Sequence, residues 1–359
     1  MDEKFVMNIV MPDRIPDGLE TVVELLRPSM LYSDQVILNC SELNELADAY
    51  NKYGDDYRAM YIEDRRDMID SVKDALAKNP GKTIQIKGVS VSADDFLGIF
   101  LDELAESIRT LDENDKVFKK ILPHIRSGEI QLQEYNRLPE KNENGEFELD
   151  SEEVDIRYIN CLLTDALDYE YYILFDSSLF DTVDRAVKEL TVLHNKGKYK
   201  HAGFVKEVIP TLPDFDRASL DEIVDIKREL KEPLERFRRE VYSFVGKINF
   251  LPWEKDFKEE CKSIYMTTMK DSVDEIRELT KTTSILKNIA LNLADLSATE
   301  LIGGITASVL AGDYWAIAAS LFAGGKVVRE TAEYLKRLKE AKENHMYFYY
   351  AAGKKLSSL

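Results

Sequence analysis

Hydrophobic and polar residues follow two different patterns along the first two hundred residues. Short apolar runs rich in β-branched and aromatic residues are typical of strands, and apolar residues spaced three and four apart are typical of helices. The predicted strands are 5–10, 35–39, 83–88, 129–133, 171–176 and 204–209. The predicted helices are 19–30, 41–50, 57–78, 93–111, 115–127 and 178–194. This mixture predicts a helix-rich α/β region that opens with a βαβ-like unit.

The second part of the chain shows helical spacing only. Its clearest apolar stripe consists of Leu234, Phe237, Val241, Phe244, Val245 and Ile248. Pro233 precedes this stripe, so we expect it to begin or kink a helix rather than lie in the middle of one. Two prolines and several turn-forming residues cluster at 210–219. We therefore predict a mixed α/β domain over residues 1–212 and an all-helical domain over residues 213–359.

The least polar part of the chain is the run 301–325, which contains one ionisable residue, Asp313. The run is long enough for one membrane span, which needs about 20 residues. An Asp at the centre of such a span costs about 2.5–3.5 kcal/mol. Gly312 and Asp313 instead suit the end of one helix and the start of the next. We expect a buried Ala/Gly-rich helical hairpin in the C-terminal region, with membrane insertion as the alternative.

Composition and charge narrow the class of protein. Hydrophobic residues make up 44% of the chain and charged residues 32%, as in globular proteins. The net charge of −19 opposes contact with nucleic-acid phosphates, so we expect no nucleic-acid partner. Residues 326–355 depart from this acidity with eight Lys or Arg and four Glu. Such a segment suits an anionic membrane surface, which keeps the membrane alternative open.

Cysteine usage and the first residues bear on the compartment. Cys40, Cys161 and Cys261 are widely spaced and odd in number, which argues against a disulfide framework and favours a reducing compartment. The first residues lack a basic region followed by an apolar core, so no signal peptide is expected. We predict a cytoplasmic protein.

The candidate catalytic residues are acidic. The chain contains none of the common strings for phosphate loops, dinucleotide binding, zinc proteases or paired cysteines. Asp176 ends the predicted strand 171–176, and Asp181 and Asp184 follow closely. Ligands of α/β sheets bind at strand ends, and clustered carboxylates can hold Mg²⁺. Asp176 before two serines is also typical of a helix N-cap, which is the favoured interpretation. We expect neither a cofactor nor a resident metal.

Histidines and arginines offer weaker candidates. The histidines lie far apart, without metal-ligand spacing, at His124, His194, His201 and His345. We expect each to be hydrogen-bonded or solvated, with His194 and His201 on a turn. The predicted helix 234–248 carries Arg236, Arg238 and Arg239 beside its apolar stripe. These arginines favour a solvated, salt-bridged face, with a surface for an acidic partner as the alternative.

Three segments carry a resemblance to other proteins. They are "LLRPSMLYSDQVILN" (25–39), "LDEIVDIKRELKEPLERFRREV" (220–241) and "LKRLKEAKENHMYFYY" (335–350). The chain resembles uncharacterised prokaryotic proteins encoded among mobile-element and antiphage-defence genes. The resemblance implies a bacterial cytoplasmic origin. None of the three segments is a catalytic signature, so no site residue is carried over.

The absence of catalytic motifs and the large helical surface predict a non-enzymatic protein. We expect a protein-interaction or regulatory component of a defence or mobile-element system. We expect it to bind a protein partner or a second copy of itself. One alternative is a membrane-active effector that inserts residues 301–325. The other is a metal-dependent hydrolase that uses Asp176, Asp181 and Asp184.

Overall fold

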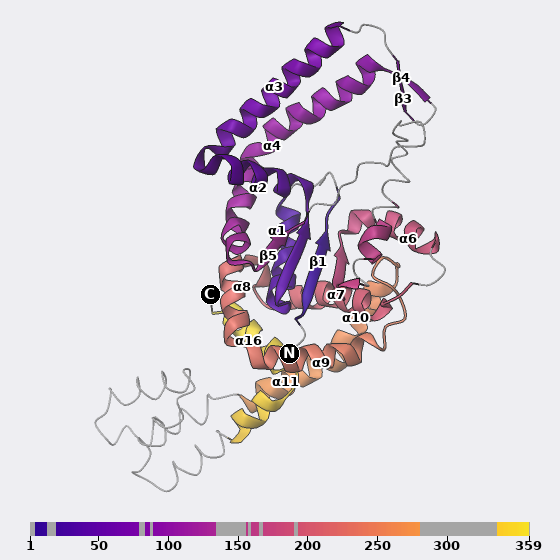
Figure 1. Ribbon diagram of the computed structural model, residues 1–359. Coiled ribbons are helices and arrows are strands. Elements are labelled where there is room, and N and C mark those ends of the chain that lie inside the picture. Colours follow the sequence, from indigo (N-terminus) through magenta and orange to yellow (C-terminus); the bar gives the residue numbers. More distant parts are fainter. Residues whose placement is uncertain are drawn as a thin grey trace, which may run out of the picture. The chain divides into compact units, whose positions relative to one another are not determined.

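A small parallel sheet lies within a helix-rich chain (Figure 1). The computed structural model describes residues 4–12, 19–78, 83–86, 89–133, 156, 159–164, 168–189, 193–280 and 336–358. In spatial order, the sheet consists of β5 (Ile130–Leu132), β2 (Gln35–Asn39), β1 (Val6–Val10) and β6 (Tyr172–Phe175). The predicted helix-rich α/β character is confirmed, and each of these four strands falls on a predicted one.

All three strand pairings of this sheet are parallel. Val10 of β1 is in register with Asn39 of β2 on one side and with Phe175 of β6 on the other. Parallel sheets are normally covered on both faces, and their strands therefore read as apolar runs rather than as alternating ones. Accordingly, every residue of β1 and β2 after the first is buried.

Helices pack against the sheet from several parts of the chain. Helix α1 (Glu20–Tyr32) contacts β1 and β2, α4 (Ala93–Ser127) contacts β5, and α7 (Lys196–Val208) contacts β6. Helix α8 (Leu220–Glu229) packs on α1. A hydrophobic core cluster lies around β6 and consists of Val10, Ile159, Leu162, Leu163, Ile173, Phe175, Val183, Ala186 and Tyr199.

The chain divides into two compact units. The first unit contains residues 1–229 and 241–262, and the second contains residues 230–240 and 263–359. The division falls within helix α9 (Lys231–Val245). The predicted domain boundary after residue 212 stays a prediction.

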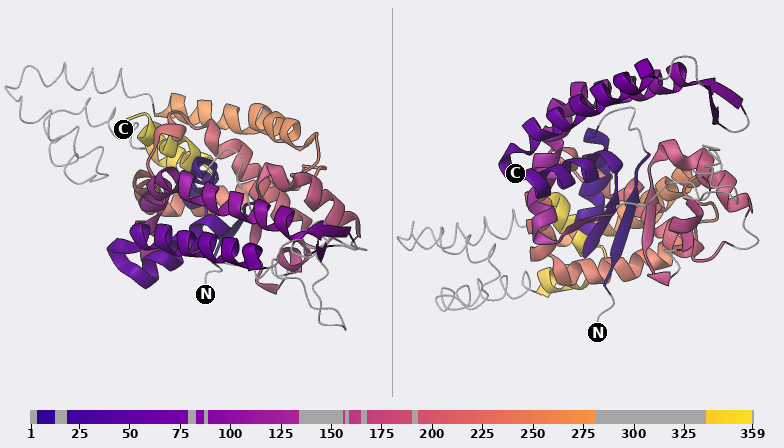
Figure 2. Two further views of the ribbon diagram at one scale, coloured as in Figure 1. Left: turned by 90° about the horizontal axis from the view of Figure 1, so that it is seen from above. Right: turned by 45° about the horizontal axis from the view of Figure 1, so that its top comes forward.

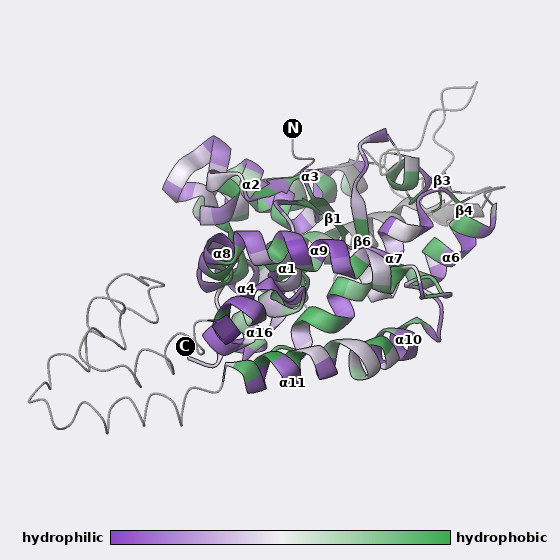
Figure 3. Cartoon of the chain, turned by 90° about the horizontal axis from the view of Figure 1, so that it is seen from below, coloured by the Kyte–Doolittle hydropathy of each residue, from purple (hydrophilic) through white to green (hydrophobic). Residues whose placement is uncertain are grey.

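The described part of the second unit is helical. After the first residues of α9 it contains a π-helical turn η5 (Tyr265–Met269), α11 (Lys270–Leu279) and α16 (Tyr347–Leu356). The ring of Phe237 lies 5.4 Å from that of Phe348, and the Thr280 and Tyr350 hydroxyls are 2.6 Å apart. The alternation of hydrophilic and hydrophobic residues along α11 is visible in Figure 3.

The predicted apolar stripe of α9 is confirmed, because all six of its residues are buried. Pro233 lies in the first turn of α9, where its missing N–H costs little. The described residues beyond 213 contain helices and no strand. The run 301–325 lies outside the described residues, so the helical hairpin and the all-helical character of the whole C-terminal region stay predictions.

Two long helices of the first unit run side by side, as Figures 1 and 2 show. Helix α3 (Tyr57–Lys78) follows α2 (Ser41–Tyr53) and the short turn η1 (Gly54–Asp56), and it packs against α4. An antiparallel hairpin of β3 (Thr83–Ile86) and β4 (Val89–Ser92) joins α3 to α4. We call α3 together with residues 93–115 of α4 the arm.

Two local predictions are wrong. Residues 204–208, predicted as a strand, belong to helix α7, and residues 209–211 form a 3₁₀ turn. Phe204, Val205 and Val208 are buried at spacings that a helix also provides, and the β-rich composition of the run concealed this. The predicted break between 111 and 115 is absent, because α4 continues as one helix of 35 residues.

The polar residues that suggested a break in α4 find partners across the arm. Asp112 pairs with Arg58 of α3, and Asp115 accepts a hydrogen bond from the Tyr57 hydroxyl. Polar side chains that are satisfied by a neighbouring helix do not interrupt their own helix. The sequence alone shows five polar residues in succession, 112–116, and no partner for them.

Candidate functional site at the carboxyl edge of the sheet

The strand order of the sheet reverses at β1. The chain adds β2 and then β5 on one side of β1, and β6 on the other side. In open parallel sheets, ligands bind beyond the carboxyl ends of the strands at such a reversal. The residues that follow β1 and β6 are therefore the first place to look for a binding site. We call this position, with Asp176 and the α7 residues beside it, the carboxyl-edge site.

Asp176 lies at this edge and begins the helical segment that follows β6. Its backbone N–H donates to the carbonyl of Val10, 2.9 Å away, which continues the pairing of β1 with β6. Its Oδ1 accepts hydrogen bonds from the Ser178 N–H, at 2.9 Å, and from the Ser178 Oγ, at 2.6 Å. Asp176 thus caps the turn η2 (Ser177–Leu179), which leads into α6 (Phe180–Glu189). The predicted N-cap geometry is present.

The structure does not gather the other two candidate aspartates around Asp176. Asp181 is exposed on α6. Asp184 pairs with Lys188 one turn further along the same helix. Within the described ranges, no three His, Cys, Asp or Glu side chains are grouped so that they could hold a metal ion. The geometry therefore offers no support for a metal-dependent hydrolase at these residues.

The charge of Asp176 acts on a lysine of α7, Lys206, that the sequence pattern did not single out. Helix α7 packs against β6, and His201 of α7 contacts Tyr172 at the start of β6. The Lys206 Nζ lies 5.4 Å from the centre of the Phe180 ring. Burial lowers the pKa of Lys206, although the carboxylates of Glu207 and Asp176 act in the opposite direction.

Besides Asp176, the charged groups near Lys206 are Glu207 and Lys258, which pair with each other. Glu207 lies 3.7 Å from the Lys258 ammonium, whose side chain is 77% exposed. Lys206 makes no hydrogen bond or ion pair with any residue that the structure describes. The signal in the sequence was two adjacent charges, Lys206 and Glu207, inside an otherwise apolar run.

The cysteine at this edge is unsuited to nucleophilic chemistry. Cys40 follows β2 directly and is buried. Burial raises the pKa of its thiol to about 12, which keeps the group protonated at neutral pH.

His201 differs from its predicted place on a turn, because it lies within α7 and is fully buried. Its Nε2 lies 2.6 Å from the Tyr32 hydroxyl, and rings of Phe5, Tyr172 and Tyr242 surround it. This cluster lies near the amino ends of β1 and β6, away from the carboxyl-edge site. The predicted role as a hydrogen-bonded histidine is confirmed.

His124 is also buried and hydrogen-bonded. Its Nδ1 lies 2.9 Å from Glu129 Oε2, and its Nε2 lies 3.4 Å from Asp221 Oδ1. The remaining histidines, His194 and His345, are exposed.

The arginines of α9 form no uniform solvated face. Arg238 is 4% exposed, and its Nη1 donates to Glu235 Oε1 at 2.7 Å. Arg236 donates to the carbonyl of Lys342 at 2.9 Å, and Arg239 is exposed. The interpretation as a solvated face therefore holds for Arg239 and is wrong for Arg238.

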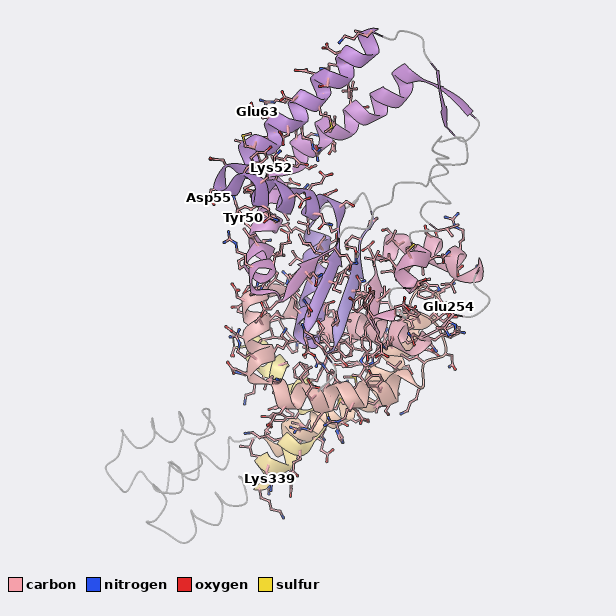
Figure 4. All side chains as sticks on the ribbon, viewed as in Figure 1. Tyr50, Lys52, Asp55, Glu63, Glu254 and Lys339 are labelled. Atoms are coloured by element: carbon pink, nitrogen blue, oxygen red, sulfur yellow. The ribbon has the colours of Figure 1, made fainter. Side chains whose placement is uncertain are left out.

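The arm presents a second candidate surface, in this case for a macromolecule. Tyr57 is the single buried residue among the α3 residues whose exposure is described. The Met68 side chain of α3 is 40% exposed, and Glu63 stands at the surface of the same helix (Figure 4). A helix of this length in a domain normally buries an apolar stripe. Helix α3 instead leaves most of its circumference in solvent.

The base of the arm is fixed by buried polar contacts. The Asp115 side chain is 4% exposed, and it accepts hydrogen bonds from Tyr57 and, at 2.7 Å, from the Lys119 ammonium. Burial raises the pKa of Asp115, but these two hydrogen bonds and the charges of Lys119 and Arg58 together outweigh burial, so the pKa is lowered overall. Nearby, Arg65 pairs with Glu45 of α2. These contacts hold the first turns of α3 in place.

Comparison with known proteins gives no relative. No family model, no curated protein and no solved structure matches the chain. None of the helices that the structure describes has both the length and the apolar character needed to cross a membrane. The run 301–325 lies outside that search, so its insertion into a membrane stays a prediction.

Proposed function

We propose that the protein is a non-enzymatic interaction component that binds a protein partner, or a second copy of itself, through the arm. The exposure of α3 carries this proposal. Helix α3 has 22 residues, and helices in domains gain most of their stability from packing. Helix α3 packs on α2 and α4, yet it leaves apolar and charged side chains exposed and available to another molecule.

The side chains exposed on α3 suit a protein partner better than a nucleic acid. Met68 provides a flexible apolar side chain of the kind that is enriched at protein interfaces. Exposed charges of both signs lie on the same helix, including Glu63, Arg66 and Asp67. Mixed charges allow specific pairing with a protein and lack the single positive sign that phosphate contacts require.

The biological context that we propose rests on the resemblance in residues 25–39, 220–241 and 335–350. We propose that the protein acts in the cytoplasm of a prokaryote, within a defence or mobile-element system. Expression of the chain together with its neighbouring genes during phage challenge tests this setting. A chain whose deletion changes neither phage survival nor element transfer would contradict it.

A pair of exposed methionines allows a matched test of the arm. Tagged protein is recovered from its native host as the wild type, as Met68→Asp and as Met266→Asp, a residue of η5 whose side chain is 47% exposed. We expect Met68→Asp to reduce the recovered partner by at least about tenfold, which corresponds to about 1.4 kcal/mol of binding free energy. Met266→Asp should leave recovery unchanged.

Sedimentation of the purified full chain distinguishes a partner from self-association. If a second copy is the partner, the wild type sediments as an oligomer that Met68→Asp dissociates. If both methionine variants recover the same proteins as the wild type and all three sediment alike, the arm is not the interaction surface.

A further inference from the structure

Two asparagines of neighbouring strands, Asn8 of β1 and Asn39 of β2, are buried on the same face of the parallel sheet. Their exposed fractions are 0% and 3%. Side chains two residues apart on a strand point to the same face, and the register of the strands places four apolar residues on that face with them: Val10, Ile37, Ile173 and Phe175. An amide in such surroundings costs free energy unless its donors and acceptors are hydrogen-bonded.

The contacts of Asn39 fix the orientation of both amides. Its Nδ2 lies 2.5 Å from Asn8 Oδ1 and 3.4 Å from the carbonyl oxygen of Ile9. A backbone carbonyl can only accept a hydrogen bond, so the Asn39 atom that faces it is the nitrogen rather than the oxygen. Asn8 then presents its oxygen to that nitrogen.

This orientation leaves one donor and one acceptor of the pair without a partner. Asn8 Nδ2 and Asn39 Oδ1 are both buried, and neither makes a hydrogen bond to a residue that the structure describes. Buried polar atoms in proteins are almost always bonded to protein or to ordered water. The pair therefore requires a molecule that accepts a hydrogen bond from Asn8 and donates one to Asn39.

We propose that Asn8 and Asn39 hold one buried water molecule that bridges Asn8 Nδ2 and Asn39 Oδ1. Water is the smallest molecule that accepts and donates at once, and buried waters commonly bridge polar groups in this way. A cation would be repelled by the N–H donors of Asn8, and an anion by the oxygen of Asn39. The bridge ties β1 to β2 beside the carboxyl-edge site and is independent of the arm.

Nuclear magnetic resonance of the full-length protein with isotope-labelled asparagine tests this bridge. Cross-relaxation between water and side-chain amide hydrogens is measured in the rotating frame, where a bound water gives a cross-peak opposite in sign to hydrogen exchange. We expect this cross-peak at the Asn8 amide, which Asn8→Leu identifies by its loss. The Asn39 amide should give a weaker one, because its hydrogens face Asn8 Oδ1 and the Ile9 carbonyl. Absence of the cross-peak at Asn8 overturns the proposal.

A matched pair of variants tests whether the water contacts both amides. Asn39→Leu removes the acceptor and should abolish the cross-peak at Asn8. Asn44→Leu makes the same change at an asparagine that is 8% exposed and donates to the Gln133 carbonyl at 3.1 Å, and it should leave the cross-peak unchanged. A cross-peak that survives in a folded Asn39→Leu variant overturns the bridge. If Asn39→Leu does not fold, the wild-type spectrum decides, and a cross-peak at Asn8 no stronger than at Asn39 overturns it.

Discussion

In the sheet, residues 7–10 of β1 and 36–39 of β2 are buried, whereas in the arm Tyr57 is the one buried residue among the α3 residues whose exposure is described. The two regions belong to the same compact unit. The strands are held by apolar surface removed from water, and the arm is held by contacts near its base. A substitution should therefore lower the free energy of unfolding by much more in the sheet than along the arm.

The largest expected difference comes from removing one apolar side chain from each region. Ile9 of β1 is 0% exposed, and Ile9→Ala should lower the free energy of unfolding by about 2–5 kcal/mol. Met68→Ala in the arm should change it by no more than about 0.5 kcal/mol, since its side chain is 40% exposed. Urea denaturation followed by circular dichroism measures both. Equal losses would mean that the arm is packed as tightly as the sheet.

Substitution of alanine for Gly203 and for Gly98 should change the free energy of unfolding in opposite directions. A Cβ on Gly203 of α7 would lie 2.7 Å from Phe257 Cζ and 2.8 Å from Pro252 Cγ, so Gly203→Ala should destabilise the protein by about 1–3 kcal/mol. A Cβ on Gly98 of the arm would meet nothing within 4 Å, and Ala is the better helix former, so Gly98→Ala should stabilise by about 0.5–1 kcal/mol.

Thermal unfolding of the two glycine variants measures the shifts. The same chemical change then reports the local packing, because both glycines lie in helices. A rise in stability for Gly203→Ala would show that the ring of Phe257 has room to move aside.

The sheet was the easier region to predict from sequence. Strands β1, β2 and β6 are almost entirely buried and mostly apolar, with Asn8 as the one polar residue inside β1, so each is visible without tertiary information. The stripe of α9 was visible for the same reason, since a buried helix face repeats at fixed spacing. Both signals are local. The end of helix α7 was missed because its apolar residues at 204, 205 and 208, together with Ile209 of the following turn, also fit a short strand.

The sites depend on contacts between distant residues, which a local pattern does not contain. The place of Asp176 at a strand end was predictable from the strand and the two serines that follow it. The environment of Lys206 was not, because it requires α7 to lie along β6 and Phe180 to lie under the amine. The continuity of α4 likewise depends on Arg58 and Tyr57, more than fifty residues earlier in the chain.

The smallest expected effect concerns the base of the arm and depends on pH. Asp115 has a pKa below its ordinary value of 3.8, because hydrogen bonds from Lys119 and Tyr57 and the charges of Lys119 and Arg58 together outweigh the effect of burial. A carboxyl group with a lowered pKa in the folded state stabilises the fold fully above its ordinary pKa. That contribution is lost as the pH falls through the lowered value. Asp115→Asn should therefore cost about 1 kcal/mol at pH 7, since Lys119 is partly exposed and Asn still accepts one hydrogen bond.

Denaturation of the wild type and of Asp115→Asn between pH 7 and pH 3 measures this contribution. The difference in unfolding free energy between them should shrink below about pH 4, where the wild-type carboxyl begins to take up a proton. Asp112→Asn is the matched control, because Asp112 faces the same Arg58 with a side chain that is 73% exposed. Its effect should stay within about 0.5 kcal/mol at every pH. A difference for Asp115→Asn that is constant with pH would mean that packing, rather than the charge of Asp115, fixes the base of the arm.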